Sequence, residues 1–108
     1  MVVKMSTLSE FTGDFYDADY YENGKASGKG WLENYKWMPR RSLREALAYV
    51  DYFGLDENSK VLDVGCAKGF IVKALNILEI PSEGCDISEY ALSFTDGNCW
   101  NCSDDNSW

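Results

Sequence analysis

One ten-residue stretch, Val61 to Phe70, limits the fold of this chain more than any other part of it. It begins in a short apolar run with two valines, Lys60–Val64, and such a run is typical of a strand buried on both faces. Small residues then alternate through a tight loop at 65–69, and Phe70–Leu78 places apolar side chains at helical spacing. This order predicts a strand, a glycine loop and a helix, which is the repeating unit of a parallel α/β sheet.

The segment before this strand predicts a helix over about residues 42–53. Ser42 is placed as its N-cap, and Glu45, three residues later, completes a capping box. Gly54 provides a stop for the helix. The apolar residues that we expect to face the core are Leu43, Ala46, Leu47, Val50 and Phe53.

Two further strands are predicted after the glycine loop. The first covers residues 80–85, with Pro81 near its start, and the second is a brief strand at 99–102. Ser88 is the expected N-cap of a short helix that runs to Phe94 between them. Strands and helices that alternate in this way form right-handed parallel crossovers. The predicted fold class is therefore α/β, with about three strands and flanking helices.

Residues 1–41 are predicted to form an irregular arm, rich in tyrosine and tryptophan, ahead of an α/β unit at 42–108. The run at 24–30, Gly-Lys-Ala-Ser-Gly-Lys-Gly, is typical of a flexible break. One short helix is expected around Leu32–Trp37, and Pro39 either ends that helix or begins the next element.

Two acids lie beside the loop in positions that suit a ligand. Asp63 comes two residues before Gly65, and Asp86 follows Gly65 by 21 residues and ends the next strand. From that second position a carboxylate accepts hydrogen bonds from both ribose hydroxyls of an adenosine. Small residues in the loop let a ligand approach the backbone, and the N-terminus of the following helix offers N–H groups. The pattern predicts a nucleoside site between the loop and Asp86.

With these residues described, the chain resembles class I S-adenosylmethionine-dependent methyltransferases over about residues 42–105. Val61–Phe70 is similar to their first motif, an apolar pair, an acid, an apolar residue and Gly-x-Gly-x-Gly, and Gly84–Ser88 is similar to their second. Ala67 departs from the first motif, because it replaces the middle glycine. The resemblance implies a partial Rossmann-like, doubly wound parallel sheet that binds S-adenosylmethionine. The cofactor-binding residues that it implies are Asp63, Gly65, Cys66, Ala67, Gly69, Asp86 and Ile87, with Asp104 at the adenine amino group.

A nicotinamide or flavin dinucleotide domain is the nearest alternative. Its G-x-G-x-x-G pattern needs a glycine where Phe70 stands, so that register fails. Asp63 would also repel a pyrophosphate, whereas it would attract the ammonium group of S-adenosylmethionine. Simpler interpretations stay open: the glycines shape only a turn, the two acids cap a strand end and a helix, and Asp104 belongs to an acidic tail.

Two features outside the motifs have alternative interpretations. Tyr20, Tyr21 and Tyr35 of the arm either close over the cofactor, as N-terminal aromatics do in some members of the family, or pack in the core or on the surface. Lys68 is expected to point out of the loop into solvent.

Charge and hydropathy bear on the partners. The net charge is -8, and the one basic cluster, six residues between Lys25 and Arg44, is local, so nucleic acid is not indicated as a partner. No apolar run approaches the ~20 residues of a membrane span, and no signal segment is recognisable, so a cytoplasmic location is expected. The four cysteines are then expected to be thiols. Cys99 and Cys102 match C-x-x-C, but the chain has no histidine and no metal site is predicted.

The sequence identifies neither a methyl acceptor nor a catalytic residue. In the family, the residues that contact the acceptor follow the fourth strand, so the resemblance implies the cofactor-binding half of a methyltransferase, cut short before the other half. The alternative is a non-catalytic module that binds a nucleoside or a protein. The family order also leaves Val61–Val64 with an open apolar edge, which we expect either to pair with a second copy of the chain or to be covered by the arm.

Overall fold

The three predicted strands are present, together with a fourth that the sequence pattern did not indicate. The structure is a computed structural model that describes residues 2–4 and 13–103. Its strands are β1 (Val2–Lys4), β2 (Lys60–Val64), β3 (Ser82–Asp86) and β4 (Cys99–Asn101). Its helices are the 3-10 turn η1 (Gly13–Phe15), α1 (Ala18–Ser27), α2 (Pro39–Phe53), α3 (Phe70–Ile77) and α4 (Glu89–Leu92).

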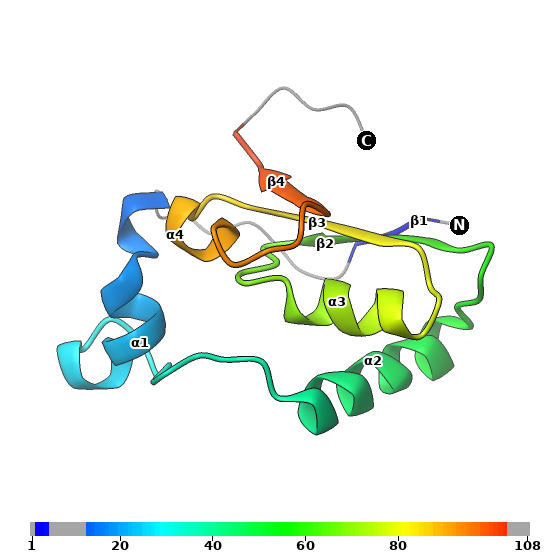
Figure 1. Ribbon diagram of the computed structural model, residues 1–108, viewed down its shortest axis with the longest axis horizontal. Coiled ribbons are helices and arrows are strands. Elements are labelled where there is room, and N and C mark those ends of the chain that lie inside the picture. The colour runs from blue at the N-terminus through cyan, green and yellow to red at the C-terminus, as the bar shows by residue number, and fades with distance from the viewer. Residues whose placement is uncertain (1, 5–12, 104–108) are drawn as a thin grey trace.

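All four strands run parallel, in the spatial order β1-β2-β3-β4 (Figure 1). β2, β3 and β4 are neighbours, which confirms the α/β class and the parallel pairing of the predicted strands. β1 lies along the other side of β2, with Val3 opposite Val61. The edge of β2 that was expected to be open is therefore paired over 60–62. Of the two expected solutions, cover by the chain's own N-terminal residues is the one observed.

The described sheet is wound in one direction only. Because its spatial order follows the chain order, right-handed crossovers place their helices on the same face, and Figure 1 shows α2 and α3 together on one side. A doubly wound sheet also needs a point at which the spatial order of its parallel strands reverses along the chain, so that other helices pack on the opposite face. The strands within the described residues contain no such reversal, so this part of the prediction is not met by them.

The hydrophobic core lies between the sheet and the layer formed by α2 and α3. One cluster of buried apolar side chains fills it: Ala46, Leu55, Val61, Ala74, Leu75 and Ile80. α2 begins at Pro39, whose fixed φ suits a first helical position, so Ser42 lies buried inside the helix and is not its N-cap. Gly54 ends the helix as expected, in the left-handed conformation. Leu47, which was expected in the core, is exposed.

The arm contains a helix where a flexible break was expected. Asp17 caps α1, because its side chain accepts a hydrogen bond from the Tyr20 N–H at 3.0 Å. The helix is kinked at Asn23, continues to Ser27 and closes at Gly28, in the left-handed conformation. The segment predicted as a helix, Leu32–Trp37, is instead irregular, with Asn34 in the left-handed conformation.

Hydrogen bonds to α1 hold that irregular segment in place. The Asn34 N–H donates to the Glu22 carbonyl at 3.1 Å, and the Tyr35 N–H donates to the Tyr21 carbonyl at 3.2 Å. These bonds satisfy backbone groups that a helix over the same residues would have used internally. The two halves of the arm therefore form one unit.

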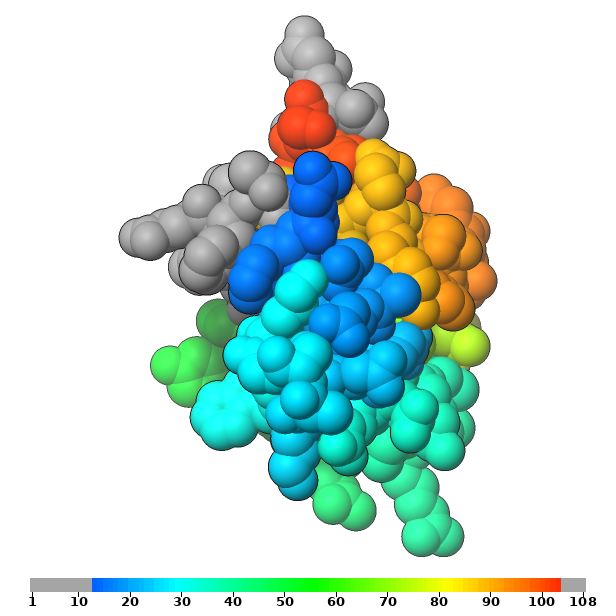
Figure 2. Space-filling model, turned by 90° about the vertical axis from the view of Figure 1, so that its left-hand side faces the viewer, coloured from blue at the N-terminus to red at the C-terminus, as the bar shows by residue number. Residues whose placement is uncertain are grey.

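The arm covers the carboxyl ends of β2 and β3. Figure 2 looks onto this end of the molecule, where the blue and cyan residues of the arm occupy the centre of the surface. Tyr21 is buried beneath them, and the Ser88 hydroxyl donates to the Tyr16 carbonyl. No helix within the described residues is long and apolar enough to cross a membrane.

Candidate functional site

The glycine loop holds three alternate residues in the left-handed conformation. The φ angles of Gly65, Ala67 and Gly69 are 88°, 54° and 77°. Glycine adopts such angles without steric cost, whereas an L-residue pays about 1–2 kcal/mol for them. The Gly-x-Gly-x-Gly spacing therefore has a direct conformational reason here, and Ala67 occupies a position that would suit a glycine better.

Backbone hydrogen bonds fasten the loop to β3. The N–H groups of Gly65 and Cys66 both donate to the Cys85 carbonyl, at 2.7 and 3.0 Å. The Gly69 N–H donates to the Cys66 carbonyl at 2.9 Å, which closes the turn before α3 begins. Backbone hydrogen bonds thus hold the start of the loop to β3 and the end of the loop to its own Cys66.

Asp86, the last residue of β3, is in direct contact with the loop. One carboxylate oxygen accepts from the Ala67 N–H at 2.8 Å, and the other accepts from the Ser88 N–H at 2.9 Å. The side chain is buried, with 7% of the residue exposed. Each carboxylate oxygen can accept a second hydrogen bond, so this arrangement leaves acceptor capacity for a ligand.

The remaining predicted residues lie in different surroundings. Asp63 is buried in β2, where it is paired in register with Gly84 of β3. Ile87 lies half-buried under the arm, so close to Gly13 that a Cβ added there would be 2.0 Å from the Ile87 carbonyl oxygen. Asp104 lies outside the described residues.

Lys68 is buried, which corrects the expectation that it points into solvent. Its side chain is 4% exposed, and its ammonium lies 2.6 Å from a carboxylate oxygen of Glu22 in α1. The same ammonium donates to the Tyr35 carbonyl at 2.7 Å. The loop is thereby tied to both halves of the arm.

Aromatic rings complete the surroundings of this ammonium. It lies 4.1 Å from the ring centre of Phe94, 5.6 Å from that of Tyr90 and 5.8 Å from that of Tyr35. Cations are attracted to the faces of aromatic rings, and more strongly where water is excluded. We call Lys68, Glu22 and these three rings the lysine latch.

The contacts of the lysine latch shift the pKa values of Glu22 and of two tyrosines. Burial alone would raise the pKa of Glu22, but hydrogen bonds from Lys68 and from the Tyr90 hydroxyl outweigh burial and lower it. The hydrogen bond to Glu22 raises the pKa of Tyr90 to about 12, and burial raises the pKa of Tyr35 to about 12. Glu22 is therefore ionised at neutral pH, and both tyrosines are protonated.

Tyrosines of the arm also approach the predicted nucleoside site. Burial, and then the charge of Asp86, raise the pKa of Tyr21, whose hydroxyl hydrogen bonds with Ser88. Tyr20 lies near enough to Asp86 for that charge to raise its pKa as well, after burial. Of the three tyrosines considered from the sequence, Tyr20 and Tyr21 are thus near Asp86, and Tyr35 belongs to the lysine latch.

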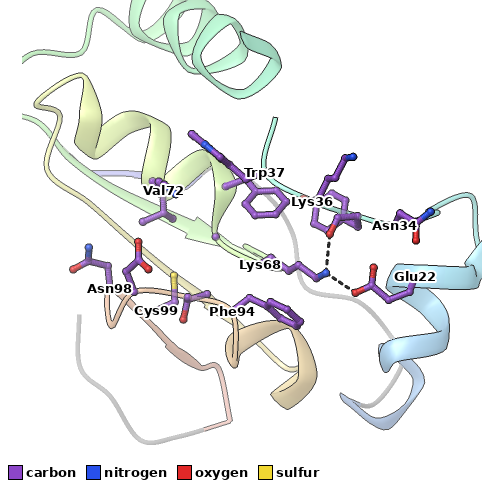
Figure 3. A pocket seen from close by; sticks show the side chains of 15 residues that line it. Glu22, Asn34, Lys36, Trp37, Lys68, Val72, Phe94, Asn98 and Cys99 are labelled. Atoms are coloured by element: carbon purple, nitrogen blue, oxygen red, sulfur yellow. Dashed lines mark hydrogen bonds and ion pairs between the residues drawn. The ribbon is translucent and has the colours of Figure 1, made fainter. Parts of the chain in front are cut away.

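A pocket of about 430 Å³ opens beside the second half of the loop (Figure 3). Its walls come from the loop and α3, from α1 and the irregular segment of the arm, and from the turn between α4 and β4. Lys68, Trp37 and Phe94 line it, and Figure 3 shows Cys99 beside Asn98 and Phe94. Neither Asp63 nor Asp86 lines this pocket.

The cysteines of C-x-x-C do not face each other. The Cys99 thiol interacts with that of Cys66 in the loop, and the Cys102 thiol interacts with that of Cys85 in β3. Cys99 lies in β4, whereas Cys102 lies in the turn that follows it. One thiol pair therefore connects β4 to the loop, and the other connects the turn after β4 to β3.

The sequence pattern missed the lysine latch and the thiol pairs, because both form between residues that are distant in the chain. Lys68, a lysine inside a loop of small residues, was the one local sign of the lysine latch. The residues near it in the sequence did not indicate that its partner is Glu22. No protein-family model matches the chain, and no curated protein and no solved structure matches it.

Proposed function

We propose that this chain binds S-adenosylmethionine as the cofactor-binding portion of a class I methyltransferase, with a methyl acceptor of unknown identity. One observation carries the proposal. The glycine loop and Asp86 meet at the carboxyl ends of two adjacent parallel strands, β2 and β3, and a hydrogen bond of 2.8 Å joins them. Ligands of open α/β sheets bind at the carboxyl ends of the strands.

The residues of this site have chemistry that suits the cofactor. Asp86 would accept hydrogen bonds from the ribose hydroxyls through the acceptor capacity that its backbone partners leave. Asp63 supplies negative charge near the loop, which suits a ligand with a cationic ammonium and sulfonium. Gly65 is exposed and lacks a side chain, so a ligand can approach the backbone there.

Methyl transfer needs little acid–base chemistry from the protein. The reaction is an in-line displacement on a sulfonium carbon, and holding the two reactants in line supplies much of the rate acceleration. The cofactor would supply the activated methyl group, and the chain's own residues would hold and orient it. We assign no residue a catalytic role.

A non-catalytic module is the second candidate, and one observation favours it. Both oxygens of Asp86 already accept hydrogen bonds from backbone N–H groups, so this carboxylate serves the fold whether or not a nucleoside binds. We expect no efficient transfer of label when the chain is incubated with radiolabelled S-adenosylmethionine and pools of protein, nucleic acid and small metabolites, because the proposal assigns it cofactor binding alone. Transfer of label to any pool would exclude the non-catalytic module and would contradict a role limited to cofactor binding.

Calorimetric titration with S-adenosylhomocysteine and with NAD tests the binding itself. We expect S-adenosylhomocysteine to bind more tightly, and tighter binding of NAD would overturn the assignment. Asp86→Ala should weaken the binding of S-adenosylhomocysteine by about 1.5–3 kcal/mol, the scale of hydrogen bonds to a charged group. Glu57→Ala, an exposed acid in the turn before β2, is the matched control and should bind normally.

Asp86→Asn removes the charge and keeps one acceptor oxygen, but its NH2 group faces the other of the two backbone N–H donors, so its binding is compared with its fold. Circular dichroism and urea unfolding of each variant show whether the loop is still in place. If Asp86→Asn folds normally and binds S-adenosylhomocysteine as the wild type does, the carboxylate only organises the loop and the second candidate is favoured.

A further inference from the structure

We propose that Cys99 is a peroxide-reactive thiol and that Cys66 is its resolving partner, so that oxidation joins β4 to the glycine loop through a disulfide. This inference concerns the pocket beside the loop and does not depend on which ligand the chain binds. Its ligand class is a small hydroperoxide, hydrogen peroxide being the simplest member.

The backbone brings the two cysteines together. Cys99 is the register partner of Gly84 in the neighbouring strand β3. A Cβ added at Gly84 would lie 2.7 Å from the Cys66 Cβ and 3.0 Å from its Sγ, so Cys66 packs directly over that glycine. Neighbouring strands are about 4.8 Å apart, which places Cys66 over the strand next to Cys99.

The side chain of Cys99 points toward the same loop. A Cβ added at Gly69, three residues after Cys66, would lie 3.3 Å from the Cys99 Sγ. The thiols of Cys66 and Cys99 interact with each other. Two cysteines in this relation can be joined with little backbone movement.

The two thiols differ in access, which assigns their roles. Cys99 is half-buried and lines the pocket of about 430 Å³, so a small molecule can reach its sulfur. Cys66 is 4% exposed and does not line that pocket. Oxidant-sensing cysteines are accessible and lie beside a resolving cysteine, which is the arrangement of this pair.

The protonation of the pair agrees with these roles. The hydrogen bond with Cys66 is the main influence that lowers the pKa of Cys99. The same interaction, burial, and the nearby charges of Asp63 and Asp86 raise the pKa of Cys66. Cys99 is therefore the thiol that becomes a thiolate first, and the thiolate is the nucleophile.

The chemistry balances with one peroxide. The Cys99 thiolate attacks a peroxide oxygen, the O–O bond breaks, and the products are Cys99 sulfenic acid and hydroxide. The Cys66 thiol then attacks the sulfenic sulfur, an S–S bond forms, the S–O bond breaks, and the thiol proton leaves with the hydroxyl as water. The hydroxide takes up the proton that the Cys99 thiol released when it ionised, so two thiols and one hydrogen peroxide give one disulfide and two waters.

Peptide mapping of the full chain tests the proposal. The reduced, folded protein is treated with hydrogen peroxide, free thiols are alkylated, and the crosslinked peptides are identified by mass spectrometry. We expect the first crosslink to join Cys66 to Cys99. A first crosslink between Cys99 and Cys102, or between Cys85 and Cys102, would overturn the proposal, and this readout needs no substitution.

Two variants test the assigned roles. In Cys66→Ser the sulfenic acid has no partner, so dimedone, which traps sulfenic acids, should label Cys99. In Cys99→Ser the rate of peroxide-dependent thiol loss should fall by about tenfold or more. Cys102→Ser, a half-buried thiol with a buried neighbour of its own, is the matched control and should still form the Cys66–Cys99 crosslink. Unchanged thiol loss in Cys99→Ser would refute the role of Cys99.

Discussion

Glu22→Gln tests the ion pair that holds the arm against the glycine loop. The substitution keeps the size of the side chain but removes the charge that faces the Lys68 ammonium at 2.6 Å. The ammonium cannot turn to water in exchange, because the Lys68 side chain is 4% exposed. The variant therefore leaves a buried cation without its counter-charge, which is among the costliest changes for a folded protein.

The expected loss can be worked out from the surroundings of the pair. Removing one partner of a buried ion pair costs about 3–5 kcal/mol. The cost here should be smaller, because the Glu22 side chain is 28% exposed and water already screens it. The ammonium also keeps the Tyr35 carbonyl at 2.7 Å and the Phe94 ring at 4.1 Å. We expect the free energy of unfolding to fall by about 2–3 kcal/mol.

Urea unfolding measures this change by linear extrapolation. Glu33→Gln makes the same change at an exposed position of the arm, and we expect its effect to stay within about 0.5 kcal/mol. Lys68→Met removes the cation, and in that background Glu22→Gln should cost much less than it does alone. A loss below about 0.5 kcal/mol for Glu22→Gln, or additive losses in the double variant, would refute the coupling of the two charges.

The loop and the lysine latch each give one further prediction. Ala67→Gly should raise the free energy of unfolding by about 1 kcal/mol, because Ala67 has a φ of 54° that glycine adopts without strain. Ala48→Gly, at an exposed helical position, should lower the free energy of unfolding by a similar amount. The urea midpoints of the two variants should therefore shift in opposite directions. The pKa of Glu22 is lowered below its ordinary value of 4.5, so its ionised form stabilises the fold fully above pH 4.5 and loses this contribution as pH falls through the folded-state pKa. The difference in unfolding free energy between the wild type and Glu22→Gln should therefore disappear in acid, and a difference that grows in acid would contradict this sign.

The strand–loop–helix unit was predictable because its signals are local. Alternate small residues are needed where the backbone takes positive φ, and Gly65 and Gly69 show this in the sequence itself. The place of Asp86 at the end of β3 followed from its spacing, 21 residues after Gly65. The arm was not predictable in the same way. Its capping residue, Asp17, is a local sign that the pattern of glycines between 24 and 30 obscured, and the burial of Lys68 depends on a partner far along the chain.

The lysine latch also has a consequence for the order in which the chain folds. Glu22 contacts residues that are 46 and 68 positions away, Lys68 and Tyr90, and Tyr16 contacts Ser88 across 72 positions. Contacts of such separation require long loops to close, and they form slowly compared with local ones. The crossovers between β2, β3 and β4 close much shorter loops, so they can assemble before the arm docks. The arm is then a late and separable layer, whose detachment would open the carboxyl end of the sheet and the β1 edge of β2 while leaving β2, β3 and β4 paired.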